Sequence, residues 1–173
     1  MSAALELVAQ SDTHPTIARL LDRLYAAISF EEGAEPDWAA LRDLFSKHAR
    51  ITRITPEGID YLSPEAFLDM THSLFEMGAY TSFYEFELQR RVDQFGNTAQ
   101  VWSAYETRRN LHAHEALGRG LNSIQLICDG DSWRVLGLLW DETNANPELD
   151  VARTFAARTV VARTVVAKDE IGG

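Results

Sequence analysis

Cysteine is almost absent from this sequence, because Cys128 is the only one among 173 residues. A single cysteine excludes an internal disulfide and a cysteine-based zinc site, and it favours a reducing, cytoplasmic compartment. Positive charge is also scarce: 16 lysine and arginine residues stand against 26 aspartate and glutamate residues, a net charge of −10. Nucleic acids and anionic membrane surfaces are therefore not expected as partners.

Targeting segments and common catalytic motifs are missing as well. The apolar start, Met1–Gln10, carries Glu6 and lacks a basic region, and it is too short to span a bilayer. We expect neither a secretory signal nor a membrane anchor. The sequence has no glycine-rich phosphate loop, nucleophile elbow or helical His-Glu-x-x-His motif, so no cofactor is expected.

What is present is enough for one folded core. With 173 residues, 46% of them hydrophobic, one domain that buries about 70% of the unfolded surface is expected. We assign this domain to residues 1–147 and predict a partly helical or disordered extension over 148–173. The extension repeats Ala-Arg-Thr every five residues, a spacing that fits neither a helix nor a strand. An arm that docks on the acidic body is the alternative.

The first half of the chain has the apolar spacing of helices, and the second half has that of strands. The expected elements are a helix over 15–28, a short helix from Pro36, a strand over 49–55, a helix from Ser63 to Gly78, and strands from residue 79 to 95, 99–105, 121–128 and 133–140. Turns are predicted at Phe95-Gly96-Asn97 and Asp129-Gly130. Helices followed by an antiparallel sheet indicate an α+β fold with the helices on one sheet face.

The last predicted strand is apolar on both sides. Leu136, Leu138 and Trp140 alternate with Trp133, Val135 and Leu139. Three helices can cover only one face of the sheet, so we expect the outer face to pack against a second copy in a homodimer.

The residues 95–106 and 119–126, together with Trp140-Asp141, resemble SnoaL-like members of the nuclear transport factor 2-like superfamily. The order of elements agrees, and the resemblance spans about 13–146. It implies a cone-shaped barrel in which three N-terminal helices pack on a curved antiparallel sheet and leave an apolar pocket open at one end.

The resemblance also implies site residues. The ketosteroid isomerases of this superfamily use a carboxylate base with an oxyanion-binding tyrosine and a protonated aspartate. Tyr25 matches the tyrosine, but Thr52 and Arg53 stand where the base is expected, and Ser123 stands at the aspartate. Trp140 matches the pocket wall. Without the carboxylate, isomerisation by that route has no proton acceptor.

Four side chains are expected to bind a ligand: Tyr105, Ser123, Gln125 and Trp140. For Ser123 and Gln125, the resemblance turns the strand face inward, whereas the periodicity alone turns it outward. Arg53 either faces water or holds an anionic group of the ligand. Tyr25 either packs at the edge of the core or donates a hydrogen bond to an oxyanion.

Histidines offer a base but no metal site. His48 is the candidate base near the pocket, with a histidine at a helix end as the alternative. His112 and His114 lack a convergent third ligand, so a metal is not expected.

The sequence thus predicts a protein that binds a small apolar or aromatic molecule, with lyase, isomerase or cyclase activity as one form of this hypothesis. Whether it is an enzyme stays open. The alternative is a non-catalytic, dimeric binding or assembly domain, and a third hypothesis is a small subunit of a larger oxygenase.

Overall fold

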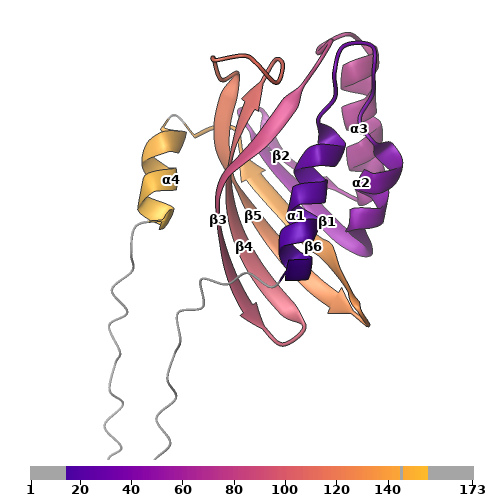
Figure 1. The fold of residues 1–173 in the computed structure, drawn as a ribbon, viewed down its shortest axis with the longest axis vertical. Coiled ribbons are helices and arrows are strands. Elements are labelled where there is room, and N and C mark those ends of the chain that lie inside the picture. The colour runs from indigo at the N-terminus through magenta and orange to yellow at the C-terminus, as the bar shows by residue number, and fades with distance from the viewer. Residues whose placement is uncertain (1–14, 145, 156–173) are drawn as a thin grey trace, which may run out of the picture.

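A computed structural model describes residues 15–144 and 146–155. The elements in these residues are α1 Pro15–Ile28, α2 Trp38–Leu44, β1 Phe45–Thr55, β2 Gly58–Leu62, α3 Pro64–Glu76, β3 Tyr84–Phe95, β4 Thr98–Arg108, β5 Gly118–Asp129, β6 Ser132–Asp141 and α4 Pro147–Phe155. Figure 1 shows α1, α2 and α3 on one side of the sheet and α4 on the other. None of these helices is both long enough and apolar enough to cross a membrane.

The strands form a single curved sheet in the order β2-β1-β6-β5-β4-β3. Neighbouring strands are antiparallel except β1 and β6, which run parallel. The sheet is therefore mixed and remains open rather than closing into a barrel. The predicted α+β arrangement, with three N-terminal helices on a curved sheet, is confirmed. Strand β2 was not predicted because it is a short edge strand whose exposed side chains include the apolar Ile59 and Tyr61.

Local capping explains where the helices begin and end. Asp37 accepts a hydrogen bond from the backbone N–H of Ala40 (2.9 Å) at the start of α2. Ser63 accepts one from Ala66 (3.1 Å) at the start of α3. Gly78 takes a φ of +73° just after α3, a left-handed conformation that glycine adopts without strain.

The core lies between the three N-terminal helices and the concave face of the sheet. Its fully buried members come from α1 and from four strands: Leu21, Ile51, Val101, Ile124 and Val135, each 0% exposed. These residues hold the helices against the sheet through apolar burial.

A bulge changes the side-chain parity of β6. Gln125 pairs with Gly137, but the next residue on β5, Leu126, pairs with Val135. Leu136 is the extra residue, so Val135 and Leu138 both face the core. The prediction that placed them on opposite faces was wrong, since strict alternation cannot anticipate a bulge.

The outer sheet face is partly covered by the chain itself. Helix α4 packs against β5, and Arg91 on β3 donates a hydrogen bond to the backbone oxygen of Thr154 (2.8 Å). The homodimer was expected because no predicted element remained to cover this face. Because α4 covers part of the face, the argument for a homodimer is weaker. The start of the chain and the repeats after Phe155 lie outside the described residues.

Candidate functional site

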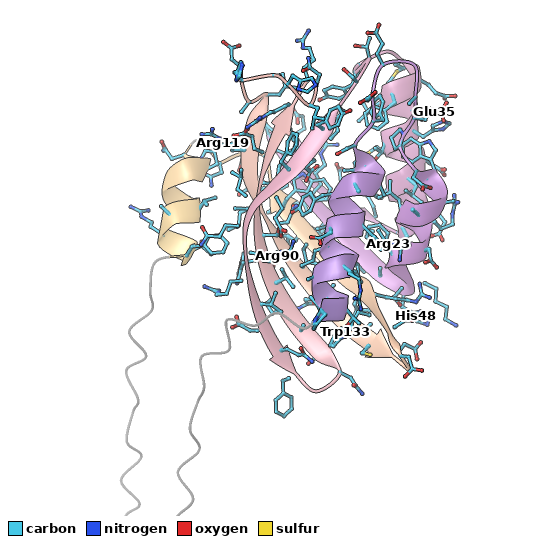
Figure 2. The ribbon with its side chains drawn as sticks, viewed as in Figure 1. Arg23, Glu35, His48, Arg90, Arg119 and Trp133 are labelled. Carbon is cyan, nitrogen blue, oxygen red and sulfur yellow. The ribbon has the colours of Figure 1, made fainter. Side chains whose placement is uncertain are left out.

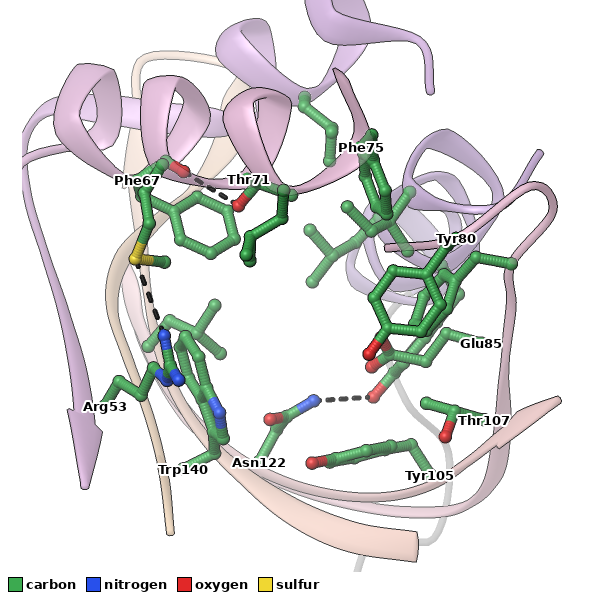
Figure 3. Close-up of a pocket in the computed structure, with 18 of the residues that line it drawn as sticks. Arg53, Phe67, Thr71, Phe75, Tyr80, Glu85, Tyr105, Thr107, Asn122 and Trp140 are labelled. Carbon is green, nitrogen blue, oxygen red and sulfur yellow. Dashed lines mark hydrogen bonds between the residues drawn. The ribbon is translucent and has the colours of Figure 1, made fainter. Parts of the chain in front are cut away.

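A cavity of about 390 Å³ lies between α3 and the concave face of the sheet. Figure 3 shows α3 above it and strands β4 and β5 below. The residues that line it are Leu24, Tyr25, Ile28, Leu41, Phe45, Arg53, Phe67, Met70, Thr71, Leu74, Phe75, Tyr80, Phe83, Glu85, Tyr105, Thr107, Asn122, Leu138, Trp140 and Glu142. Apolar walls with a few convergent polar groups are typical of sites for small organic molecules.

Aromatic side chains build two of the walls. The rings of Phe67 and Trp140 lie 6.0 Å apart in an edge-to-face arrangement. Phe75 contacts Tyr80 at 5.8 Å, also edge to face. Such contacts fix the rings relative to one another, so the cavity has defined walls between which a flat molecule can lie.

Glu85 places a carboxyl group inside this apolar space (Figure 3). Burial raises the pKa of Glu85 from its ordinary value of 4.5 to about 7, and a hydrogen bond with the Asn122 side chain opposes the increase. A carboxyl group that ionises near neutral pH can both accept and release a proton.

The register of β3 explains why Glu85 faces inward. Glu85 pairs with Thr107, whose side chain also lines the cavity. The intervening Phe86 faces outward, stacked on Tyr84 (6.0 Å) and under the guanidinium of Arg108 (5.1 Å). Sequence reasoning noticed the alternation of β3 but assigned no role to Glu85. The sequence signal that could have identified Glu85 is the pair Glu85 and Glu87 on one face of β3.

Tyr105 offers a free hydrogen-bond donor near Glu85. No residue in the described part of the chain forms a hydrogen bond with its hydroxyl, which points into the cavity (Figure 3). Burial raises the pKa of Tyr105, and the charges of Glu85 and Glu142 add to the increase. The hydroxyl therefore keeps its proton at neutral pH.

Gly120 makes the position of Tyr105 possible. The two residues are cross-strand partners on β4 and β5. A Cβ atom on Gly120 would lie 2.5 Å from the Tyr105 hydroxyl oxygen and 2.6 Å from the adjacent ring carbon. Only glycine leaves room for the ring to lie across β5.

Tyr25 lines the cavity, but its hydroxyl already has partners. Its oxygen lies 2.6 Å from Ser103 Oγ and accepts a hydrogen bond from Asn122 Nδ2 at 3.3 Å. Ser103 donates its own proton to Glu87 (2.5 Å), so Tyr25 must donate to Ser103. The donation to a ligand that the sequence suggested would require this bond to break.

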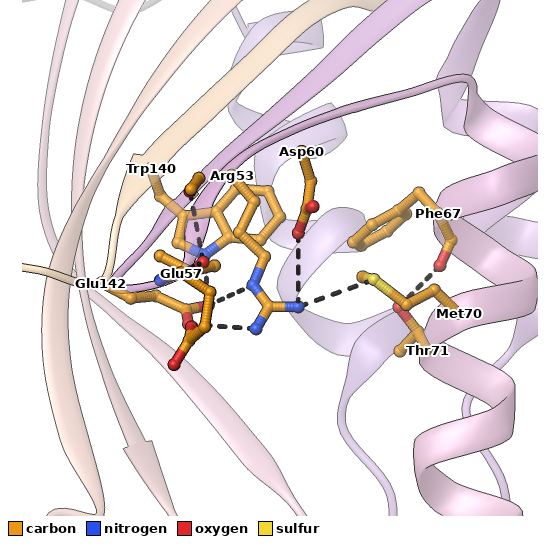
Figure 4. A network of polar contacts seen from close by, with 10 residues as sticks. Arg53, Glu57, Asp60, Phe67, Met70, Thr71, Trp140 and Glu142 are labelled. Carbon is orange, nitrogen blue, oxygen red and sulfur yellow. Dashed lines mark hydrogen bonds and ion pairs between the residues drawn. The ribbon is translucent and has the colours of Figure 1, made fainter.

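Arg53 faces the cavity rather than bulk water, yet its charge is matched by the protein (Figure 4). Its Nε and Nη2 donate to the two carboxylate oxygens of Glu142, at 2.9 and 3.2 Å. Its Nη1 lies 4.0 Å from Asp60 and 3.6 Å from the sulfur of Met70. Two carboxylates thus already surround the guanidinium that was expected to hold an anionic ligand.

Trp140 forms part of the same wall. Its indole Nε1 donates to Glu142 at 2.9 Å. The predicted positions of Arg53 and Trp140 at the pocket therefore agree with the geometry, although both side chains use their donors on Glu142.

Three of the predicted site residues do not reach the cavity. His48 lies on β1, is exposed, and points away from the body of the protein (Figure 2). Ser123 accepts a hydrogen bond from Gln100 (3.1 Å) on the outer sheet face, and Gln125 lies on that face beside Gly137. The periodicity of β5 had indicated this outward orientation, and the resemblance had reversed it.

In the residues that the structure describes, no three metal-ligating side chains come together. His112 and His114 are both exposed in the loop between β4 and β5.

The sequence matches no protein-family model and no curated protein, but solved structures share the fold. A nuclear transport factor 2-like protein of unknown function from Pseudomonas putida has a TM-score of 0.58 and 13% identity, over 72% of this chain and 82% of the other. LinA has a TM-score of 0.58 and 12% identity, over 72% and 82%.

A protein from Novosphingobium aromaticivorans, named as a scytalone dehydratase, has a TM-score of 0.56 and 12% identity, over 72% of this chain and 80% of the other. At these identities the likeness shows the fold alone. The nuclear transport factor 2-like fold expected from the sequence is confirmed.

Proposed function

We propose that the cavity binds a small, neutral, largely apolar carbonyl compound and that Glu85 removes a proton from a carbon atom of it. The observation that carries this proposal is the Glu85 carboxyl group, which lies in an apolar cavity together with the Tyr105 hydroxyl, a group with no hydrogen-bond partner among the described residues. A lyase or isomerase reaction that starts with proton abstraction fits this arrangement.

The two groups have complementary tasks. The Glu85 carboxylate takes the proton, and negative charge then develops on the carbonyl oxygen of the substrate. Tyr105 donates a hydrogen bond to that oxygen, so a fixed donor lies where the negative charge develops. The name of the Novosphingobium neighbour, a dehydratase, supports an elimination as one outcome.

Charge disfavours an anionic substrate. The polar cavity residues include the carboxyl groups of Glu85 and Glu142, while the guanidinium of Arg53 is bound to Glu142 and faces Asp60. An incoming carboxylate or phosphate would be repelled rather than paired.

A carbon acid of general use tests the proposed base before the substrate is known. In 5-nitrobenzisoxazole, a base removes the proton on C3, the N–O bond breaks with its electrons on oxygen, and a coloured nitrophenolate forms. The bicyclic probe is small enough for a cavity of about 390 Å³. We expect the protein to accelerate this reaction, and the rate to rise with pH as Glu85 loses its proton around pH 7.

The matched variants are Glu85→Gln and Glu57→Gln, the latter in the exposed turn after β1. E85Q should abolish the acceleration, E57Q should retain it, and Tyr105→Phe should slow it by roughly tenfold or more through loss of the donor. Equal rates for E85Q and E57Q would exclude Glu85 as the base.

A dimeric binding or assembly domain is the second candidate. It is favoured by apolar residues that α4 leaves uncovered, including Leu139 on the outer face of β6, 40% exposed, and Leu88 on β3, 53% exposed. Equilibrium sedimentation of the wild type and of Leu139→Arg tests this candidate. A monomeric wild type would exclude the dimer.

A further inference from the structure

A chain of hydrogen bonds connects an ion pair under α1 with the floor of the cavity. Arg90 on β3 forms an ion pair with Glu87 through Nη2 and Oε2. The other carboxylate oxygen, Oε1, accepts a hydrogen bond from Ser103 (2.5 Å). Tyr25 follows at 2.6 Å from Ser103, and Asn122 donates to Tyr25 at 3.3 Å. Ser103, Tyr25 and Asn122 are all buried.

The direction of every bond in this chain is set at its Arg90 end. A guanidinium can only donate, so Glu87 must present an acceptor to it. Glu87 as a carboxylate also accepts the only proton of Ser103, which leaves Ser103 as the acceptor for Tyr25. The oxygen of Tyr25 can then accept from Asn122, which must turn its NH₂ group toward it.

The orientation of Asn122 matters for the cavity. Its NH₂ group faces Tyr25, and its side chain also forms a hydrogen bond with Glu85. Its Oδ1 points the other way, toward the open space beside Trp140 (Figure 3). Within residues 15–144 and 146–155, no donor to this oxygen is found.

We propose that Arg90 and Glu87 are positioning residues that hold the Asn122 amide with its nitrogen toward Glu85 and its oxygen toward the ligand. This orientation of Asn122, which rests on the proposed function, narrows the substrate class to a carbonyl compound that also carries a hydroxyl or N–H group. The carbonyl oxygen accepts from Tyr105, and the hydroxyl or N–H group donates to Asn122 Oδ1.

Glu87→Gln reverses the chain instead of merely breaking it. Arg90 also donates to Asp22 (2.5 Å) and to the backbone oxygen of Ala18 (3.3 Å). Because a guanidinium cannot accept a hydrogen bond, the amide of the variant turns its oxygen to Arg90 and its NH₂ group to Ser103. Ser103 must then donate to Tyr25, and Tyr25 to Asn122. The oxygen of Asn122 then faces both Tyr25 and the Glu85 carboxylate.

The experiment follows the titration of Glu85 by residue-specific ¹³C NMR of its side-chain carboxyl group. The other titratable groups that line the cavity with it are Tyr25 from α1, Arg53 from β1, Tyr80 after α3, Tyr105 from β4 and Glu142 after β6. In E87Q we expect the titration midpoint of Glu85 to rise by roughly one pH unit, because a donor is replaced by an acceptor. Removal of the Glu87 charge alone would lower the titration midpoint of Glu85. An unchanged or lowered midpoint therefore overturns the proposal.

A matched control is Glu106→Gln on the outer face. Glu106, like Glu87, has a nearly buried side chain, 4% against 10% exposed, and it is paired with Arg108 and Arg119. It has no link to the cavity, so E106Q should leave the titration of Glu85 unchanged.

A double-mutant cycle shows whether the effect passes through the chain. Tyr25→Phe removes the link between Ser103 and Asn122, so adding E87Q to Y25F should not raise the midpoint of Glu85 and should leave only the lowering that comes from the lost Glu87 charge. A change of the same size in both backgrounds would overturn the proposed route.

If E87Q alone fails to fold, Ser103→Ala interrupts the chain at the next residue. The midpoint of Glu85 should then change between S103A and the wild type, and an equal midpoint overturns the proposal.

These NMR measurements need no ligand and separate the two proposals. A raised midpoint in E87Q without any base catalysis by the wild type supports the positioning role and excludes the proposed function. Base catalysis with an unchanged midpoint supports the proposed function and excludes the positioning role. For the substrate class, thermal-shift assays should favour hydroxyketones over matched ketones without the hydroxyl, and equal shifts would exclude the selection by Asn122.

Discussion

The buried Glu85 carboxyl group should make the stability of the protein depend on pH. Its pKa is about 7 in the folded protein, against an ordinary value of 4.5. Below pH 4.5 the group is protonated in both the folded and the unfolded chain and has no effect. As the pH rises from 4.5 to 7, the unfolded chain loses this proton first, so folding becomes less favourable. Above pH 7 the cost is constant.

The size of this cost follows from the two pKa values. At 1.36 kcal/mol for each pH unit, the difference corresponds to roughly 3 kcal/mol as an upper value. The cavity is open to solvent, which screens the charge, so we expect about 2 kcal/mol. E85Q keeps the shape and one oxygen acceptor for Asn122 but cannot ionise. It should match the wild type at pH 4 and be more stable by about 2 kcal/mol at pH 8.

Urea unfolding at pH 4, 6 and 8 measures these differences directly. The control is E57Q, whose side chain is exposed and whose stability should follow that of the wild type at each pH. A constant difference between E85Q and the wild type across this range would refute the reasoning, because it would mean that Glu85 has the same pKa in the folded and unfolded chain.

Two further predictions concern the shape and the charge of the cavity. Gly120→Ala should displace Tyr105 and weaken the binding of 5-nitrobenzisoxazole. The control is Gly118→Ala, whose new Cβ atom has an ordinary 3.4 Å contact and should leave the binding unchanged. Equal affinity of the two variants in a fluorescence titration would contradict the role of Gly120. Arg53→Gln should leave Glu142 without its bidentate partner and lower the stability by about 1 kcal/mol, and unchanged urea midpoints at 0.1 M and 1 M salt would show that the ion pair contributes nothing.

The fold could be predicted from the sequence because its evidence is spread over many residues. The helical spacing of α1 and the N-cap of α3 each rest on several side chains, and an error at one position does not change the element. The two-residue turns at Gly96 and Gly130 likewise need a positive φ, which both glycines adopt (+54° and +67°). Because of this redundancy, the α+β arrangement could be predicted from the sequence alone.

The candidate site could be predicted only in part, because it depends on which face of each strand turns inward. The resemblance placed Trp140 at the pocket wall, and Tyr105 was expected beside it; both side chains line the cavity. For β3, burial of the more apolar face would have put Phe86 inside and Glu85 outside. The register with β4 places Glu85 inside, and Phe86 is instead covered by Arg108 and Tyr84 on the outer face. Glu85, which breaks the hydrophobic pattern, thus has a raised pKa because of its burial.

The same reasoning explains why the resemblance misled at β5. It aligned Ser123 with a cavity residue, while the neighbouring Asn122 is the side chain that reaches the cavity. A shift of one residue exchanges the two faces of a strand completely. Asn122 lies between Ile124 and the glycine at 120 on the inward face, and its amide is buried with both Tyr25 and Glu85 as partners. A polar side chain on the more apolar face of a strand must find such partners within the protein, since an unpaired buried amide costs about 1–3 kcal/mol. Asn122 on the apolar face of β5 was therefore the sign, already present in the sequence, that a polar network lies beneath the helices.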